Sequence, residues 1–166
     1  MRWWLVVMLS AGLVPAFGQH DTLAPMQNVL YIEALGTGGL GSLNYERDIW
    51  HKDRFTTSAR IGISTIHVHD FTRQFNPDML FPIGAVFCYG ERFQAEASGG
   101  VAFTSIVYPD PEDFSPVRRS EVQGWLALGG RYLDPRNGWL LRVTYTPIIE
   151  FGTLRHWGGV SIGHAF

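Results

Sequence analysis

The chain has 166 residues, of which 46% are hydrophobic and 17% charged, and its formal net charge is −2. Lysine occurs only at Lys52 and no basic patch is present, so nucleic acid is not an expected partner. Because Cys88 is the single cysteine, the chain cannot form an internal disulfide, and we interpret Cys88 as a small apolar residue within a strand.

Residues 1–18 have the layout of a secretory signal peptide. Arg2 supplies a positive charge, residues 3–9 begin an apolar run, and Ala16-Phe17-Gly18 places small residues where a signal peptidase cleaves. The apolar run is shorter than the ~20 residues that a spanning helix needs, which disfavours a membrane anchor. We therefore expect cleavage before Gln19 and a single mature domain over residues 19–166.

Beyond residue 18, short runs of alternating apolar and polar residues are separated by turn residues. This pattern predicts an all-β chain. Eight strands are expected, at residues 28–36, 40–50, 54–67, 79–90, 92–106, 121–133, 139–149 and 156–166. Most of them are about as long as the ~9–11 residues of a tilted membrane strand.

The predicted connections alternate in length. Those after the second, fourth and sixth strands are tight, whereas those after the third and fifth, residues 68–78 and 107–120, are long. The first and seventh connections are short but fall on the side of the long ones. An even-stranded antiparallel barrel with both termini at one end sorts its connections in this way, with short periplasmic turns and longer outer loops.

Alternation also gives most strands one apolar and one polar face. In the strand 54–67, Phe55, Ala59 and Ile61 share one face, and Ser58 and Arg60 share the other. A soluble lipocalin-like barrel would turn the apolar face inward around a small hydrophobic ligand. An outer-membrane barrel turns it outward into lipid.

The charges on the polar faces favour the membrane barrel. They number about one per strand, fewer than a water-facing surface carries. Three are acidic and three basic, which suits pairing in a narrow lumen. We therefore predict a lumen charge network made of Glu33, Glu46, Arg60, Glu96, Arg131 and Arg142.

Aromatic residues flank all three tight turns. Membrane barrels place aromatic girdles at the interface between water and lipid. The predicted girdle consists of Trp50, Phe55, Tyr89, Phe93, Tyr132 and Trp139.

The sequence ends with VSIGHAF, so the last predicted strand runs to Phe166. In this it resembles the outer-membrane β-barrel proteins of Gram-negative-type bacteria, which end in an amphipathic strand with a terminal aromatic residue. The stretches YIEALGTGGLGSLNYER and FPIG are similar to a group of small, functionally uncharacterised outer-membrane barrels. The resemblance implies that Phe166 belongs to a signal read by the barrel-insertion machinery. His164 departs from the pattern, which more usually has an aromatic residue there.

Several local expectations follow from this topology. Leu43 and Ile49 should face lipid, and residues 36–41 should form a tight external hairpin. Pro82 and Pro147 lie inside predicted strands, where proline removes a hydrogen-bond donor. They should mark bulges or the point at which a strand leaves the bilayer.

The sequence contains no specific catalytic or metal-binding pattern. Glu150, His156 and Ser161 are candidates for a lipid A deacylase-like site, but a separation of five residues puts the last two on opposite faces of a strand. His67 and His69 form an i, i+2 pair without an identifiable third ligand, so we expect no metal and no cofactor.

We therefore predict an eight-stranded antiparallel up-and-down transmembrane β-barrel in the outer membrane, functioning as a monomer. Its expected role is structural or surface contact, through the long outer loops with Phe71, Phe75 and Phe114. A barrel of this size is filled by side chains, so no conducting pore is expected. Its expected partners are outer-membrane lipid, lipopolysaccharide and the insertion machinery. The alternatives are a lipid-modifying barrel enzyme and a soluble lipocalin-like binder.

Overall fold

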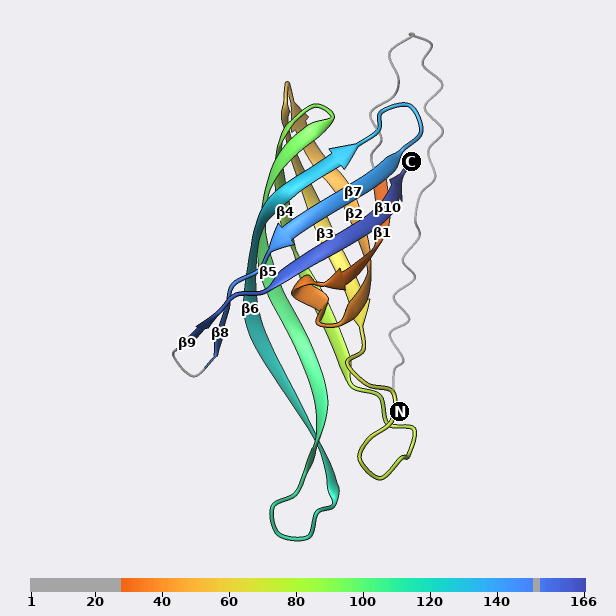
Figure 1. The fold of residues 1–166 in the computed structure, drawn as a ribbon, viewed down its shortest axis with the longest axis vertical. Coiled ribbons are helices and arrows are strands. Elements are labelled where there is room, and N and C mark those ends of the chain that lie inside the picture. The colour runs from red at the N-terminus through yellow and green to blue at the C-terminus, as the bar shows by residue number, and fades with distance from the viewer. Residues whose placement is uncertain (1–27, 151–152) are drawn as a thin grey trace, which may run out of the picture.

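The computed structural model describes residues 28–150 and 153–166, so the predicted signal peptide lies outside the described residues. Eight strands close into one barrel in the order β1, β10, β7, β6, β5, β4, β3, β2, and all neighbours are antiparallel (Figure 1). The prediction of an eight-stranded all-β barrel is confirmed. No helix in these two ranges is long and apolar enough to cross a membrane.

The barrel strands differ widely in length. They are β1 (Asn28–Leu35), β2 (Gly41–Lys52), β3 (Phe55–Ser64), β4 (Met79–Gly90), β5 (Phe93–Pro109), β6 (Pro116–Leu133), β7 (Trp139–Tyr145) and β10 (Gly158–Ala165). A 3-10 helix, η1 (Gly36–Gly38), connects β1 to β2, and a small separate hairpin, β8 (Ile148–Glu150) with β9 (Thr153–Arg155), lies between β7 and β10.

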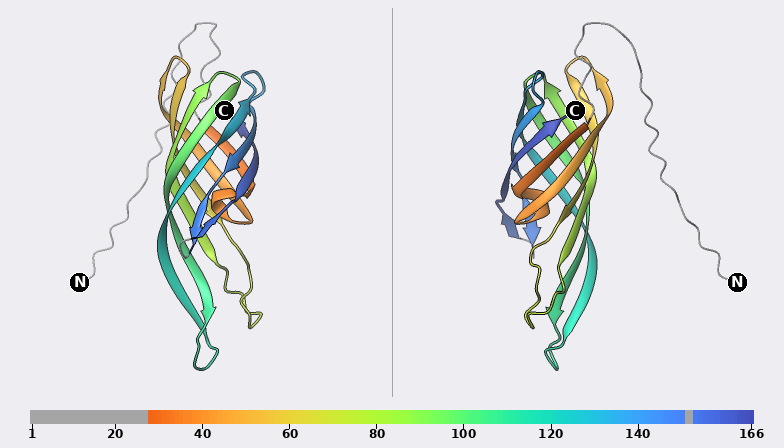
Figure 2. Two further views of the ribbon diagram at one scale, coloured as in Figure 1. Left: turned by 60° about the vertical axis from the view of Figure 1, so that its left-hand side comes forward. Right: turned by 90° about the vertical axis from the view of Figure 1, so that its right-hand side faces the viewer.

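The connections are sorted by end, as the sequence predicts. Tight turns join β2 to β3, β4 to β5 and β6 to β7 at one end, which we call the turn end (Figures 1 and 2). The barrel also closes there, because the N–H of Asn28 donates to the carbonyl of Phe166 at 3.0 Å and the N–H of Phe166 donates back at 2.8 Å. The opposite end, the loop end, carries η1, the loop 65–78, the turn 110–115 and the β8–β9 hairpin.

A β-bulge interrupts simple alternation in β2. Glu46 faces inward, so strict alternation would turn Trp50 inward as well. The register with β3 shifts between Asp48 and Trp50, and the inserted residue Ile49 is unpaired. As a result both Ile49 and Trp50 point outward, with about half or more of each side chain exposed.

The hairpin of β5 and β6 is longer than the sequence predicts. Residues 107–109 and 116–120, which we expected in a loop, continue the ladder through the pairs Val107↔Arg118 and Pro109↔Pro116. Only residues 110–115 form the turn. The two strands therefore project well beyond their neighbours at the loop end (Figure 2).

The strand expected over residues 139–149 ends instead at Tyr145, which pairs with Leu128 of β6. Continuing that register would place Pro147 opposite Leu126. The N–H of Thr146 donates to Trp157 on the β10 side, so the N–H of the next residue would have to donate to β6. Proline has no N–H to donate, so pairing with β6 stops before it. Similarly, the strand expected over residues 54–67 ends at Ser64, and the last strand begins at Gly158 rather than His156.

Pro82 is accommodated inside β4. It is fully buried, and it pairs with Ala102 of β5 on one side. On the other side, the β3–β4 register lacks pairs between Ile61↔Ile83 and Ser64↔Leu80, which is the position of Pro82. The missing donor therefore coincides with a local gap in the ladder.

Candidate functional site

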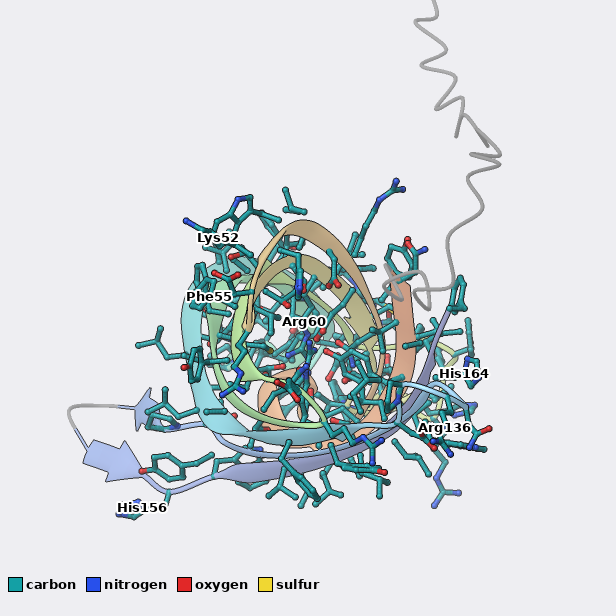
Figure 3. All side chains as sticks on the ribbon, turned by 90° about the horizontal axis from the view of Figure 1, so that it is seen from above. Lys52, Phe55, Arg60, Arg136, His156 and His164 are labelled. Atoms are coloured by element: carbon teal, nitrogen blue, oxygen red, sulfur yellow. The ribbon has the colours of Figure 1, made fainter. Side chains whose placement is uncertain are left out.

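The barrel interior contains a cluster of six charged side chains, one from each of six strands. All six lie at inward-facing positions, and each is at most 5% exposed. Figure 3 shows Arg60 inside the ring of strands and Phe55 at its periphery. The cluster consists of Glu33 on β1, Glu46 on β2, Arg60 on β3, Glu96 on β5, Arg131 on β6 and Arg142 on β7.

Arg142 is the hub of this cluster. Its Nη1 lies 2.9 Å from Oε1 of Glu46, and its Nη2 lies 3.5 Å from Oε1 of Glu33. Its Nε lies 3.3 Å from Oε1 of Glu96. One guanidinium therefore links carboxylates from three strands, β1, β2 and β5, none of which is a neighbour of β7 in the barrel.

The other two arginines complete the charge balance. Nη2 of Arg60 lies 2.8 Å from Oε2 of Glu33, and Nη1 of Arg131 lies 3.0 Å from Oε2 of Glu46. With three acidic and three basic side chains, the cluster has a formal charge of zero. A buried charge is costly unless it is paired, so this balance is the condition for keeping ions in a closed interior.

Two aromatic residues support the arginines, and we did not predict them. The hydroxyl of Tyr31 donates to Oε1 of Glu46 at 2.8 Å and accepts from Nη1 of Arg142 at 2.7 Å. The ring of Trp125 lies 5.2 Å from the Arg60 guanidinium, a cation–π contact. Alternation could have predicted that Tyr31 points into the lumen, because it stands two residues before Glu33 on the same face of the strand.

The helix η1 folds into the barrel and covers the cluster at the loop end, where we had expected an external hairpin. The hydroxyl of Thr37 donates to Oε2 of Glu33 at 3.1 Å and accepts from Nη2 of Arg60 at 2.7 Å. Gly36 has φ +80°, and a Cβ there would lie 2.7 Å from the carboxyl carbon of Glu33. Glycine therefore allows the chain to turn inward directly over the buried carboxylate.

The outward face of the barrel is apolar. Leucine, isoleucine, valine and phenylalanine side chains on the barrel strands point away from the lumen, and many are 40–70% exposed. A lipocalin-like barrel has the opposite arrangement, so the structure contradicts that alternative. An apolar exterior around a polar, ion-paired interior is the arrangement of a membrane β-barrel.

The six predicted girdle residues all lie at the turn end. They form contacts across neighbouring strands: Trp50 and Phe55 have ring centroids 5.8 Å apart, and Phe93 and Tyr132 have centroids 5.0 Å apart. Tyr89 and Trp139 are more than half exposed. Next to Trp139 lies His164, with ring centroids 6.2 Å apart, so an imidazole takes the place of the more usual aromatic side chain.

The candidate catalytic residues do not meet. His156 is exposed, and its Nδ1 lies 2.8 Å from the hydroxyl of Tyr145. Ser161 is 2% exposed and points into the lumen, on the other side of the wall. The side chain of Glu150 lies outside the described part of the structure.

The candidate metal ligands are occupied by other contacts. Nδ1 of His67 lies 2.7 Å from Oδ2 of Asp78, and the ring of His69 packs edge-on against Phe75. Within residues 28–150 and 153–166, no group of three or more His, Cys, Asp or Glu side chains is placed to hold a metal ion. Cys88 is buried.

Comparison with known proteins identifies the fold. No protein-family model matches the sequence, and no curated protein matches it. The N-terminal β-barrel domain of OprF from Pseudomonas aeruginosa matches with a TM-score of 0.54 and 17% identity, covering 84% of this chain and 98% of that domain.

A second solved protein, Ail, the attachment invasion locus protein of Yersinia pestis, matches with a TM-score of 0.52 and 10% identity, covering 83% of this chain and 93% of that chain. Ail in complex with the heparin analogue sucrose octasulfate matches with a TM-score of 0.53 and 9% identity, over 84% and 96% of the two chains. At these identities the likeness concerns the fold, which is that of outer-membrane β-barrels.

Proposed function

We propose that this chain is a monomeric outer-membrane protein with a structural or surface-contact role, and that it does not conduct ions. The observation that carries this proposal is the state of the lumen. It is filled by the Arg142-centred cluster and covered by η1 at the loop end. A channel needs a continuous water-filled path, and eight-stranded barrels leave room only for side chains.

The outer-membrane location rests on two independent features. The outward face is apolar around the barrel, and aromatic residues flank each of the three tight turns at the turn end. The fold is that of OprF and Ail, which are outer-membrane barrels. In this proposal the turn end faces the periplasm, and Phe166 forms part of the signal read by the barrel-insertion machinery.

The contact surface in this proposal is the loop end. The β5–β6 hairpin and the loop 65–78 project there, and three phenylalanines stand in otherwise polar loops. Phe71, Phe75 and Phe114 are each more than half exposed. In this proposal these three side chains are contact residues, because aromatic residues are enriched at protein interfaces.

Two measurements test the proposal. After expression in a Gram-negative-type host, the protein should fractionate with the outer membrane, and protease added to intact cells should cleave at a site introduced between residues 110 and 115. In planar bilayers the folded barrel should give no single-channel current. A stable current, or cleavage only in broken cells, would contradict the proposal.

The enzyme alternative has a separate test. Mass spectra of lipid A from cells with and without the gene should be identical, because His156 and Ser161 lie on opposite sides of the barrel wall. Loss or gain of an acyl chain that depends on the gene would overturn the non-enzymatic assignment.

A further inference from the structure

One edge of the projecting β5–β6 hairpin has no neighbouring strand among the described residues. β6 pairs with β5 along almost its whole length, but it pairs with β7 only over Leu128–Leu133. After β7 the chain enters the separate β8–β9 sheet, which diverges from β6 (Figure 1). Residues 116–127 of β6 therefore form an open strand edge, which we call the β6 edge, and residues 118–124 are all exposed.

The backbone groups of even-numbered residues point to the β6 edge. The N–H of Leu133 donates to Arg92 on the β5 side, and the N–H of Asp134 donates to Trp139 on the β7 side. Backbone groups alternate between the two sides of a strand, so the even-numbered residues within 118–124 present their N–H and C=O groups to this edge. No backbone hydrogen bond from another part of the described chain reaches them. Such an open row is a template for pairing with another strand.

The opposite edge of the same hairpin is protected. β5 pairs with β4 only as far as Ser105, which lies opposite Met79. The next residue whose N–H points to that side is Val107, and this N–H donates to Oδ1 of Asp78 at 2.9 Å. Pro109, the following residue on that side, has no N–H to donate. Of the two described edges, the hairpin is therefore open to a further strand only at the β6 edge.

The side chains of the β6 edge restrict which strand fits. Arg119 and Glu121 lie two residues apart on the inward-facing side of β6, and both are exposed. Neither forms an ion pair within residues 28–150 and 153–166. In an antiparallel pair of two β6 strands centred on Ser120, Arg119 of each copy faces Glu121 of the other, which is favourable. Moving the centre by one residue in either direction opposes two arginines or two glutamates, so the charges select this register.

We propose that the β6 edge binds the β6 edge of a second copy of this chain, as an antiparallel strand pair centred on Ser120. The proposal rests on the proposed function, since it requires the loop end to lie outside the cell. Copies in one membrane direct β6 the same way, from the loop end to the turn end, so they cannot pair antiparallel. The second copy therefore lies in a facing membrane, and the pair connects two membranes while each barrel stays monomeric in its own.

The first experiment tests contact at the centre of the pair. Full barrels are placed one per lipid nanodisc, and Ser120→Cys is oxidised with copper phenanthroline. Cys88 is buried, so the introduced thiol is the one that reacts. We expect a disulfide-linked dimer, because Ser120 of one copy faces Ser120 of the other. Glu112→Cys is the matched control: it is also exposed on the hairpin but lies away from the centre of the pair, and it should stay monomeric.

The second experiment tests the register by charge reversal. Arg119→Glu opposes two glutamates, and Glu121→Arg opposes two arginines. In sedimentation velocity, wild-type discs should form a two-disc species that each variant alone loses. An equimolar mixture of the two variants should restore this species, because the opposed charges are again complementary. Neither side chain forms an ion pair with the lumen cluster, so a gel of boiled and unboiled samples should show both variants as folded barrels.

Several results would overturn the pairing of two copies. These are wild-type discs that stay single at every concentration, Ser120→Cys that links no more than Glu112→Cys, and a mixture of the charge variants that stays single. Single discs in which the N–H groups of the β6 edge resist hydrogen exchange would assign the edge to the β8–β9 hairpin of the same chain instead. The outer-membrane assignment is tested separately, by cell fractionation and bilayer recordings.

Discussion

The inner and outer faces of the barrel wall accommodate their side chains in opposite ways. Inside, Glu33, Arg60 and Arg142 are almost completely buried and stable only because each is paired with an opposite charge. Outside, Ile32 and Ile61 are more than half exposed and need no specific partner. In this architecture, residue-specific pairing is therefore concentrated in the lumen, and the exterior needs only to be apolar.

The largest expected effect is on the hub of the lumen. Arg142→Leu leaves three carboxylates short of a partner, and removing one member of a buried ion pair costs about 3–5 kcal/mol. Urea unfolding in vesicles should show a loss of this size. The control is Arg119→Leu, since Arg119 is exposed on the projecting hairpin and should leave the midpoint unchanged. Equal midpoints for the two variants would mean that the cluster does not hold the barrel together.

A charge on the other face should also be costly, to an extent that depends on depth. Leu128→Arg places a guanidinium on the lipid-facing surface away from the girdle, where the cost is about 2–4 kcal/mol. Tyr132→Arg, at the turn-end girdle, should cost no more than ~1 kcal/mol. The same unfolding assay measures both, and a cost that does not vary with depth would contradict a bilayer around this belt.

A smaller effect on stability is expected at the end of β7, where pairing with β6 stops. Pro147→Val restores an N–H opposite Leu126, so β7 should lengthen toward β8. One added ladder hydrogen bond contributes about 1 kcal/mol. Hydrogen exchange should then show slower exchange at residues 147–149. Unchanged exchange there would mean that something other than the missing donor ends β7.

The smallest effect concerns pH at the loop end. The hydroxyl and N–H of Thr72 and the amide of Asn76 hold the pKa of Asp70 below its ordinary value of 3.8. The pKa of Asp70 is lower in the folded loop than in the unfolded chain. The hydrogen bonds to its carboxylate therefore stabilise the loop at any pH above the unfolded-state pKa. This stabilisation is lost as the pH falls through the folded-state pKa. A carboxyl NMR titration should place the inflection below 3.8. Asp70→Asn should leave a loop whose order no longer changes over that range.

Alternation alone assigns Glu33, Glu46 and Arg60 to one face, and the structure places them together. What alternation lacks is the pairing between strands that are far apart around the barrel. The link from Arg131 on β6 to Glu46 on β2 joins opposite sides of the closed wall, and no local pattern encodes the distance between them.

The sequence pattern does not show where the backbone departs from a regular strand. The bulge at Ile49 adds one residue, so Trp50 reaches the outer face although strict alternation turns it inward. The glycines of residues 36–41 indicate a turn, but not that the turn folds into the lumen, which depends on Thr37 meeting Arg60. The sequence shows that Pro147 is unfavourable inside a strand. Only the β6–β7 register shows that β7 ends before it, because Pro147 would have to donate a hydrogen bond to β6.

The most direct test of the inside-out arrangement is electrophoretic. Residues 19–166 are refolded in detergent and run on a denaturing gel with and without boiling. A closed barrel with its polar cluster inside should resist the detergent, so the unboiled band should migrate differently from the boiled one and give a β-rich circular dichroism spectrum. A single position for both samples, with a monomer that is soluble in plain buffer, would contradict an apolar membrane-facing exterior.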